Sequence, residues 1–145
     1  MTVKELVENV TKFEMESFGY LGTRTLIFER NGGERTVRCE GCAYVFEKYY
    51  FAPKTLTEEE WDNLFGRIFG ECGVMKYPKE FENNDLILDG ETWSMHIEFA
   101  NRRAKNSGGY NAYPDNRNLL AKALAEYDRF YDYEEEESGE YYDGE

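Results

Sequence analysis

The sequence is short of the residues on which several classes of protein depend. Its 145 residues include 3 Pro, 3 Cys and 1 His, and no apolar run approaches the length of a transmembrane helix. Residues 1–6 also lack the basic-then-apolar order of a secretory signal. These absences predict a cytoplasmic protein with reduced thiols and no membrane span.

Positive charge is also scarce. Lys and Arg number 17 against 30 Asp and Glu, which gives a net charge of −13. Residues 131–145 contain eight of the acids and no Lys or Arg, and without those eight the net charge is −5. Such a balance argues against direct binding to nucleic acid or to anionic membranes, because like charges repel. We therefore expect the partner to be a protein, and a basic one.

Aromatic residues, by contrast, are abundant. They make up 17% of the chain, with 12 Tyr and 10 Phe, and the hydrophobic fraction is 41%. A chain of this size and composition can bury one core of ordinary size, in which rings supply much of the area. We predict a single domain over residues 1–130, followed by an acidic Tyr/Glu-rich tail over residues 131–145.

Capping signals mark the predicted helices. Thr2 and Glu5 have capping-box spacing before a short apolar stripe, although helix and strand compete over residues 13–20. Thr57 and Glu60 form a second capping box, which predicts a helix over residues 55–73. A proline at position 114 opens a last helix. The residues expected on the buried sides of the second and last helices are Trp61, Leu64, Phe65, Ile68, Phe69 and Cys72, then Leu119, Leu120, Ala123, Leu124 and Tyr127.

Alternation and turn residues mark the predicted strands. Residues 23–30 and 35–47 flank a tight Asn-Gly-Gly turn, with Gly41 as a possible bulge or break. Residues 92–99 alternate apolar with polar, and a returning strand ends near Tyr113. The order predicts an α+β fold: an antiparallel sheet built from two hairpin-helix (ββα) units, with helices on one face and a short N-terminal element. Ser94, His96 and Glu98 would then point from the other face towards water or a partner.

Residues 93–114 resemble a known sequence signature. Trp93-x-Met95-x-Ile97-x-Phe99, followed by Gly-Tyr-Asn-Ala-Tyr-Pro at residues 109–114, resembles a C-terminal signature of small uncharacterised proteins of anaerobic gut bacteria and their mobile elements. The resemblance covers about a fifth of the chain. It implies a compact sheet-and-helix domain of mobile-element origin, and it transfers no catalytic residue.

Motifs for catalysis or for metal binding are weak. Cys39 and Cys42 form a CxxC that, with Cys72 and His96, could supply a Cys3His zinc site, but the wide spacing favours ordinary packing. The lone histidine would have to serve any Ser-His or Cys-His nucleophile, and a solvated surface histidine is the simpler interpretation. The glycine pairs lack phosphate-loop spacing. We therefore predict no enzyme activity, no cofactor and no metal.

The acidic tail suggests the leading functional hypothesis. A Lys- and Arg-lined groove that accepts a nucleic acid also suits closely spaced carboxylates, and tyrosines can stack as bases do. In size and charge the chain is similar to anti-CRISPR and anti-restriction inhibitors that mimic nucleic acid. The predicted partner-binding residues are Glu126, Tyr127, Phe130, Tyr131, Asp132, Tyr133, Glu134, Glu135, Glu136 and Glu137. The partner would be a CRISPR effector or another basic nucleic-acid-binding protein.

An alternative hypothesis uses the other face of the sheet. An immunity-type or regulatory protein would bind one cognate toxin or host protein through Ser94, His96 and Glu98, and the tail would be dispensable. A solvated, disordered tail is the simplest interpretation of residues 131–145. The sequence does not predict the oligomeric state.

Overall fold

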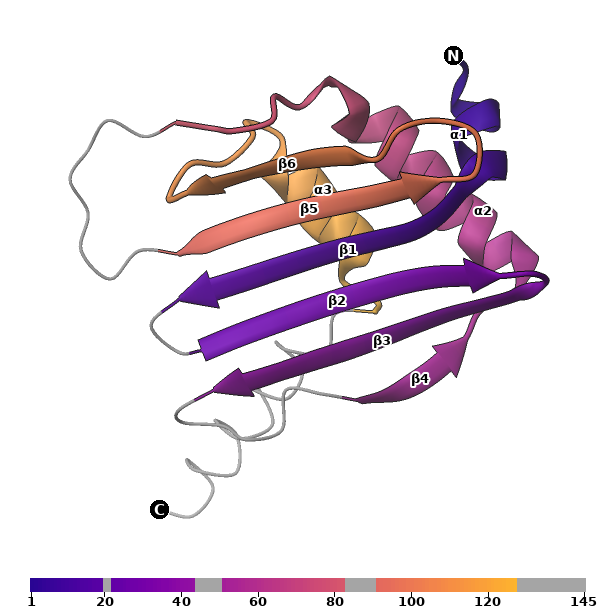
Figure 1. The fold of residues 1–145 in the computed structure, drawn as a ribbon, viewed down its shortest axis with the longest axis horizontal. Coiled ribbons are helices and arrows are strands. Elements are labelled where there is room, and N and C mark those ends of the chain that lie inside the picture. The colour runs from indigo at the N-terminus through magenta and orange to yellow at the C-terminus, as the bar shows by residue number, and fades with distance from the viewer. Residues whose placement is uncertain (20–21, 44–50, 83–90, 128–145) are drawn as a thin grey trace.

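The computed structural model describes residues 1–19, 22–43, 51–82 and 91–127, which form an α+β fold (Figure 1). The described residues contain one six-stranded antiparallel sheet and three α-helices. The strands are β1 (Val10–Gly19), β2 (Gly22–Asn31), β3 (Glu34–Ala43), β4 (Phe51–Thr55), β5 (Thr92–Phe99) and β6 (Lys105–Tyr110). The helices are α1 (Val3–Asn9), α2 (Glu58–Gly66) and α3 (Arg117–Leu124). The predicted fold class and antiparallel sheet are confirmed.

The sheet is built around β1. Its strand order is β4-β3-β2-β1-β5-β6, so the first four strands form a meander and the β5–β6 hairpin adds to the free side of β1. Phe13 on β1 pairs with Phe28 on β2 and with Ile97 on β5. The two predicted ββα units are not confirmed, because four strands precede α2 and the β1–β5 pairing joins the two halves.

The N-terminal residues follow the predicted capping. The Thr2 hydroxyl accepts a hydrogen bond from the backbone N–H of Glu5 at 3.2 Å. α1 then runs directly into β1, so the segment in which helix and strand competed is a strand. The β1–β5 register shifts between Val10 and Lys12, as in a β-bulge. This bulge lets Val10 stay buried while Lys12 points to the opposite face.

The β2–β3 hairpin has the expected tight turn. Asn31 pairs with Glu34 across a two-residue loop, and Gly32 has a φ of 60°. The expected irregularity at Gly41 is wrong, because the β2–β3 register continues unbroken through the pairing of Gly41 with Arg24.

Helix α2 begins at its predicted cap. The Glu60 N–H donates to the Thr57 hydroxyl at 3.1 Å, and the Thr57 N–H donates to the Glu60 carboxylate at 2.9 Å. The helix continues as a π-helical turn over Arg67–Glu71, and Gly73 ends it with a φ of 58°. All six residues predicted for its buried side are buried: Trp61, Leu64, Phe65, Ile68, Phe69 and Cys72.

Helix α3 is held at its start by Asn116. Its side-chain oxygen accepts from the Tyr77 hydroxyl, and its side-chain nitrogen donates to the Cys72 carbonyl, both at 2.7 Å. Burial raises the pKa of Tyr77 to about 12, so its hydroxyl stays protonated and keeps donating. The predicted burial of Leu119 is wrong, because its side chain is 41% exposed. The other four residues are buried as predicted: Leu120, Ala123, Leu124 and Tyr127.

The edge strand β6 is covered by the segment before β5. The Phe81 N–H donates to the Gly108 carbonyl at 2.8 Å, and the Ser107 hydroxyl donates to the Pro78 carbonyl at 2.6 Å. The strand ends at Tyr110, earlier than predicted. The first of these bonds satisfies the Gly108 carbonyl, a backbone group that an edge strand otherwise exposes.

The core lies between one face of the sheet and the helices, and Figure 1 shows α2 and α3 behind the sheet. T-shaped ring contacts join Phe13, Phe28 and Phe65 at centroid distances of 5.9–6.1 Å. The buried residues that the strands contribute include Val10, Phe13, Leu26, Phe28, Val37, Cys39, Trp93, Met95, Ile97 and Phe99. The alternate residues of these strands form the opposite side of the sheet, which we call the polar face.

Candidate protein-binding face

The polar face carries most of the charge that the sheet displays. Antiparallel pairing aligns its residues in rows across the strands, and one row contains His96, Glu14, Ile27 and Arg38. The charged residues and the histidine of β1, β2, β3 and β5 on this face are Lys12, Glu14, Glu16, Glu29, Glu34, Arg38, Glu40, His96 and Glu98. These residues comprise six carboxylates and two permanent cations, for a net charge of −4 with His96 neutral.

The two cations leave part of this negative charge unbalanced. Arg38 is shared between Glu29 at 3.2 Å and Glu40 at 3.1 Å, and Lys12 lies 3.5 Å from Glu14. Hydrogen bonds to these two carboxylates raise the pKa of Arg38 against the opposing effect of burial. The side chains in these pairs are 26–57% exposed and gain little from the pairing, because water screens the charges. The carboxylates therefore remain able to contact an outside cation.

His96 adds a titratable group to the same face. Its Nδ1 lies 2.6 Å from the Asn106 side-chain oxygen, and its Nε2 lies 2.8 Å from the Glu98 carboxylate. A neutral imidazole carries only one N–H, whereas the imidazolium donates to both acceptors. The hydrogen bond to Asn106, followed by that to Glu98 and the charges of Glu98 and Glu14, raises the pKa of His96 against the opposing effect of burial.

The three residues predicted for this face do lie on it together. Residues of β5 alternate in exposure, and Ser94 and Glu98 are exposed while His96 is half-buried. Their role in binding stays a prediction. The sequence did not identify the two carboxylates beside them on β1, Glu14 and Glu16, because helix and strand competed as predictions for that segment. Its alternation of Glu with Phe and Met was the available signal.

The predicted tail site lies mostly outside the described residues. Glu126 is exposed, whereas Tyr127 is 5% exposed and packs edge-on against Phe28 at 5.5 Å between ring centroids. Tyr127 is therefore part of the core and is not placed as a surface anchor. The other predicted residues lie outside the described part of the chain: Phe130, Tyr131, Asp132, Tyr133, Glu134, Glu135, Glu136 and Glu137.

The candidate zinc ligands do not come together. Cys39 and Cys72 are buried on the helix side of the sheet, whereas His96 lies on the polar face, and the side chain of Cys42 lies outside the described residues. Burial raises the pKa of Cys72, which keeps its thiol protonated and unsuited to metal binding. Within residues 1–19, 22–43, 51–82 and 91–127, no three His, Cys, Asp or Glu side chains are grouped to hold a metal.

Two further findings are negative. In the described ranges, none of the helices combines the length and the apolar character that crossing a bilayer requires. No family model, curated protein or solved structure matches this chain.

Proposed function

We propose that this protein is a non-catalytic binding protein that engages a basic, nucleic-acid-handling protein through its polar face. The observation that carries the proposal is the excess of carboxylates over cations on that face, with Glu16, Glu40 and Glu98 exposed. The helices would cover one side of the sheet and leave this side for the partner. Complementary charge speeds encounter and sets orientation between two protein surfaces.

The partner class follows from the chemistry of the face. A surface built for phosphates presents several Lys and Arg side chains close together, and a sheet with carboxylates on alternate residues offers them matching charge. An inhibitor of this kind, such as an anti-CRISPR, would exclude nucleic acid from its partner. A cognate toxin with a basic surface is the alternative partner, and the same face would serve it.

The acidic tail supports a second contact region for the same function. Its eight carboxylates and four tyrosines stand in residues 131–145 without a single Lys or Arg. In this version the tail enters the basic groove and the sheet face contributes less. The two versions differ in which carboxylates the partner requires.

The test is affinity capture from a bacterial extract with matched charge variants of the full chain. One variant carries Glu16→Gln and Glu98→Gln on the polar face, and its control carries Glu58→Gln and Glu59→Gln, two exposed carboxylates at the start of α2. We expect a basic nucleic-acid-binding protein to be retained by the wild type and the control and lost with the face variant. Added nucleic acid should compete with the capture.

Three outcomes would contradict parts of the proposal. Equal capture by the face variant and its control would remove the polar face as the contact. Loss of capture only when Glu134–Glu137 are changed to Gln would transfer the contact to the tail. Capture that nucleic acid does not disturb would favour the toxin or host-protein alternative over nucleic-acid mimicry.

A further inference from the structure

A pocket on the helix side of the sheet is unrelated to the polar face. It has a volume of about 450 Å³ and lies between α3 and strands β1, β2 and β5. Small-molecule sites in proteins commonly have volumes of ~300–1,000 Å³ and a mostly apolar lining with a few placed polar groups. Apolar lining residues include Met15, Leu26, Trp93, Leu120 and Leu124.

One wall of the pocket is a stack of flat groups. The Trp93 and Tyr113 rings are nearly parallel, 11° apart in plane and 6.4 Å between centroids. The Arg117 guanidinium lies over the Tyr113 ring, 4.5 Å from its centroid. The Trp93 indole N–H donates to the Ala112 carbonyl at 2.7 Å, and the Tyr113 hydroxyl donates to Glu91 at 2.8 Å. These bonds fix the orientation of the wall, which presents flat surfaces to a flat ligand.

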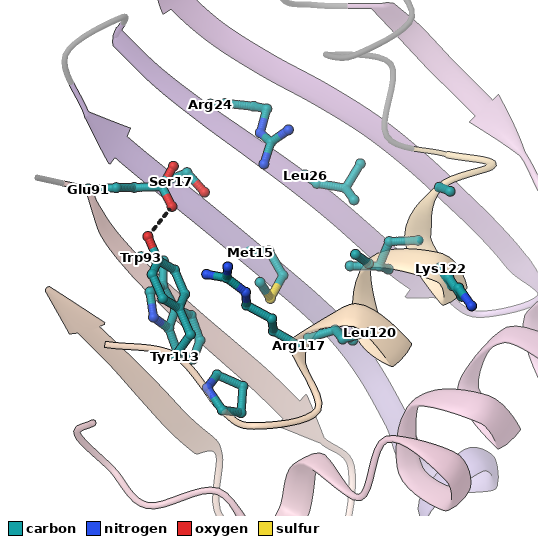
Figure 2. Close-up of a pocket in the computed structure, with 14 residues that line it drawn as sticks. Met15, Ser17, Arg24, Leu26, Glu91, Trp93, Tyr113, Arg117, Leu120 and Lys122 are labelled. Atoms are coloured by element: carbon teal, nitrogen blue, oxygen red, sulfur yellow. Dashed lines mark hydrogen bonds between the residues drawn. The ribbon is translucent and has the colours of Figure 1, made fainter. Parts of the chain in front are cut away.

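The charge of the pocket is opposite to that of the chain. Among the described residues, its lining includes three cations, Arg24, Arg117 and Lys122, and one carboxylate, Glu91. Glu91 already accepts a hydrogen bond from the Tyr113 hydroxyl, as the dashed line in Figure 2 shows. In the same view, Arg24 and Arg117 extend from opposite sides towards the middle of the pocket. A positive pocket in a chain of net charge −13 therefore favours an anion.

We infer that this pocket binds a small aromatic carboxylic acid. The ring would lie against Met15, Leu26 and the Trp93 side of the wall, where apolar surface is buried. The carboxylate would meet Arg117, whose planar guanidinium group matches carboxylate geometry. This inference is independent of the proposed protein-binding function, because the pocket and the polar face lie on opposite sides of the sheet.

The test compares two probes of nearly the same shape, 2-naphthoate and its neutral amide, 2-naphthamide. Binding to the ¹⁵N-labelled full chain is followed through the indole N–H signals of its two tryptophans. Trp93 lines the pocket, whereas Trp61 is fully buried in the core and serves as the internal control. We expect naphthoate to shift the Trp93 signal with a smaller effect on Trp61, and naphthamide to bind at least about tenfold more weakly.

Two matched variants test whether the positive charge of Arg117 contributes to naphthoate binding. Arg117→Gln should weaken naphthoate binding about tenfold, since it removes a charge-assisted hydrogen bond. Arg67→Gln removes the same charge from an exposed residue of the π-helical turn, and it should leave the affinity within about twofold. Retained signal dispersion in both spectra confirms that both variants fold.

Several results would overturn the inference. These are no Trp93 shift at millimolar naphthoate, equal binding of the amide, or equal loss in the two arginine variants. A Trp93 shift when Glu134–Glu137 are changed to Gln, without naphthoate binding to the wild type, would assign the pocket to the chain's own C-terminal segment instead.

Discussion

At the scale of single residues, His96 is the group most sensitive to its surroundings. It stands among acceptors from three strands, Glu14 on β1, Glu98 on β5 and Asn106 on β6. Its charged form is favoured in the folded state, so its pKa is raised above the usual 6.5. Protonation of His96 reduces the negative charge of the polar face, and we expect it to weaken binding to a basic partner as pH falls.

The titration of His96 can be measured directly. When the pKa of a group is higher in the folded than in the unfolded protein, its contribution to stability is complete at pH values below the unfolded-state pKa. That contribution is lost as pH rises through the folded-state pKa. Wild type should therefore gain stability over His96→Gln at pH values below about 6.5, and the gain should disappear at higher pH. Urea unfolding across this range measures the difference, and NMR titration of the imidazole gives the folded pKa. A folded pKa at or below the usual value, or an advantage that grows with pH, would contradict the described contacts.

Glycine at two adjacent positions of β6 has a packing role. A Cβ at Gly108 would lie 2.6 Å from the Trp93 carbonyl oxygen, and one at Gly109 would collide with the Ala112 carbonyl oxygen. A Cβ at Gly109 would also lie 3.2 Å from the Cβ and from the carbonyl oxygen of Phe81. The sequence indicated that these glycines lack a phosphate motif, but the contact that requires them is non-local and could not be predicted.

Gly109→Ala should therefore destabilise the protein. We expect a loss of about 1–3 kcal/mol in the free energy of unfolding, because the new methyl group forces backbone to move. Gly66→Ala is the matched control, since nothing lies within 4 Å of its Cβ position and its φ of −59° is helical. That control should be neutral or stabilising by up to about 1 kcal/mol. Thermal or urea unfolding of both variants measures the contrast, and equal effects would contradict it.

At the scale of elements, local signals located the helices and non-local pairing located the sheet. Thr57 and Glu60 stand three residues apart in sequence and complete their capping box without help from the rest of the chain. β1 is different, because its two partners are β2 and the distant β5. Its apolar residues fit a helix as well as a strand until the partners are known. For the same reason, Glu14 and Glu16 were not included in the predicted site.

The capping box of α2 gives a prediction at this scale. Thr57→Ala should lower the free energy of unfolding by about 1 kcal/mol, because the Glu60 N–H loses its acceptor. Glu60→Gln keeps a side chain that can accept from the Thr57 N–H, so it should cost less. Urea unfolding of the two variants provides the comparison. A larger loss for Glu60→Gln would show that its charge matters more than its hydrogen bond.

At the scale of the whole molecule, the sheet separates two surfaces of opposite charge. The polar face has an excess of carboxylates, and the pocket beside α3 has an excess of cations. The α+β class, the antiparallel sheet and the exposed side of β5 could be predicted, because they depend on alternation within single segments and on short turns between neighbouring ones. The strand order and the pocket could not, because they depend on which distant segments pack together.

The proposed function requires that the polar face itself, with its carboxylates, binds a cationic protein surface. The most direct measurement is the dissociation constant of a 12-residue Lys/Arg peptide for two double variants, at low and at physiological salt. Loss of Glu16 and Glu98 should weaken binding about fivefold at low salt relative to loss of Glu58 and Glu59, and added salt should shrink the difference. Equal dissociation constants for the two double variants at low salt would contradict the claim.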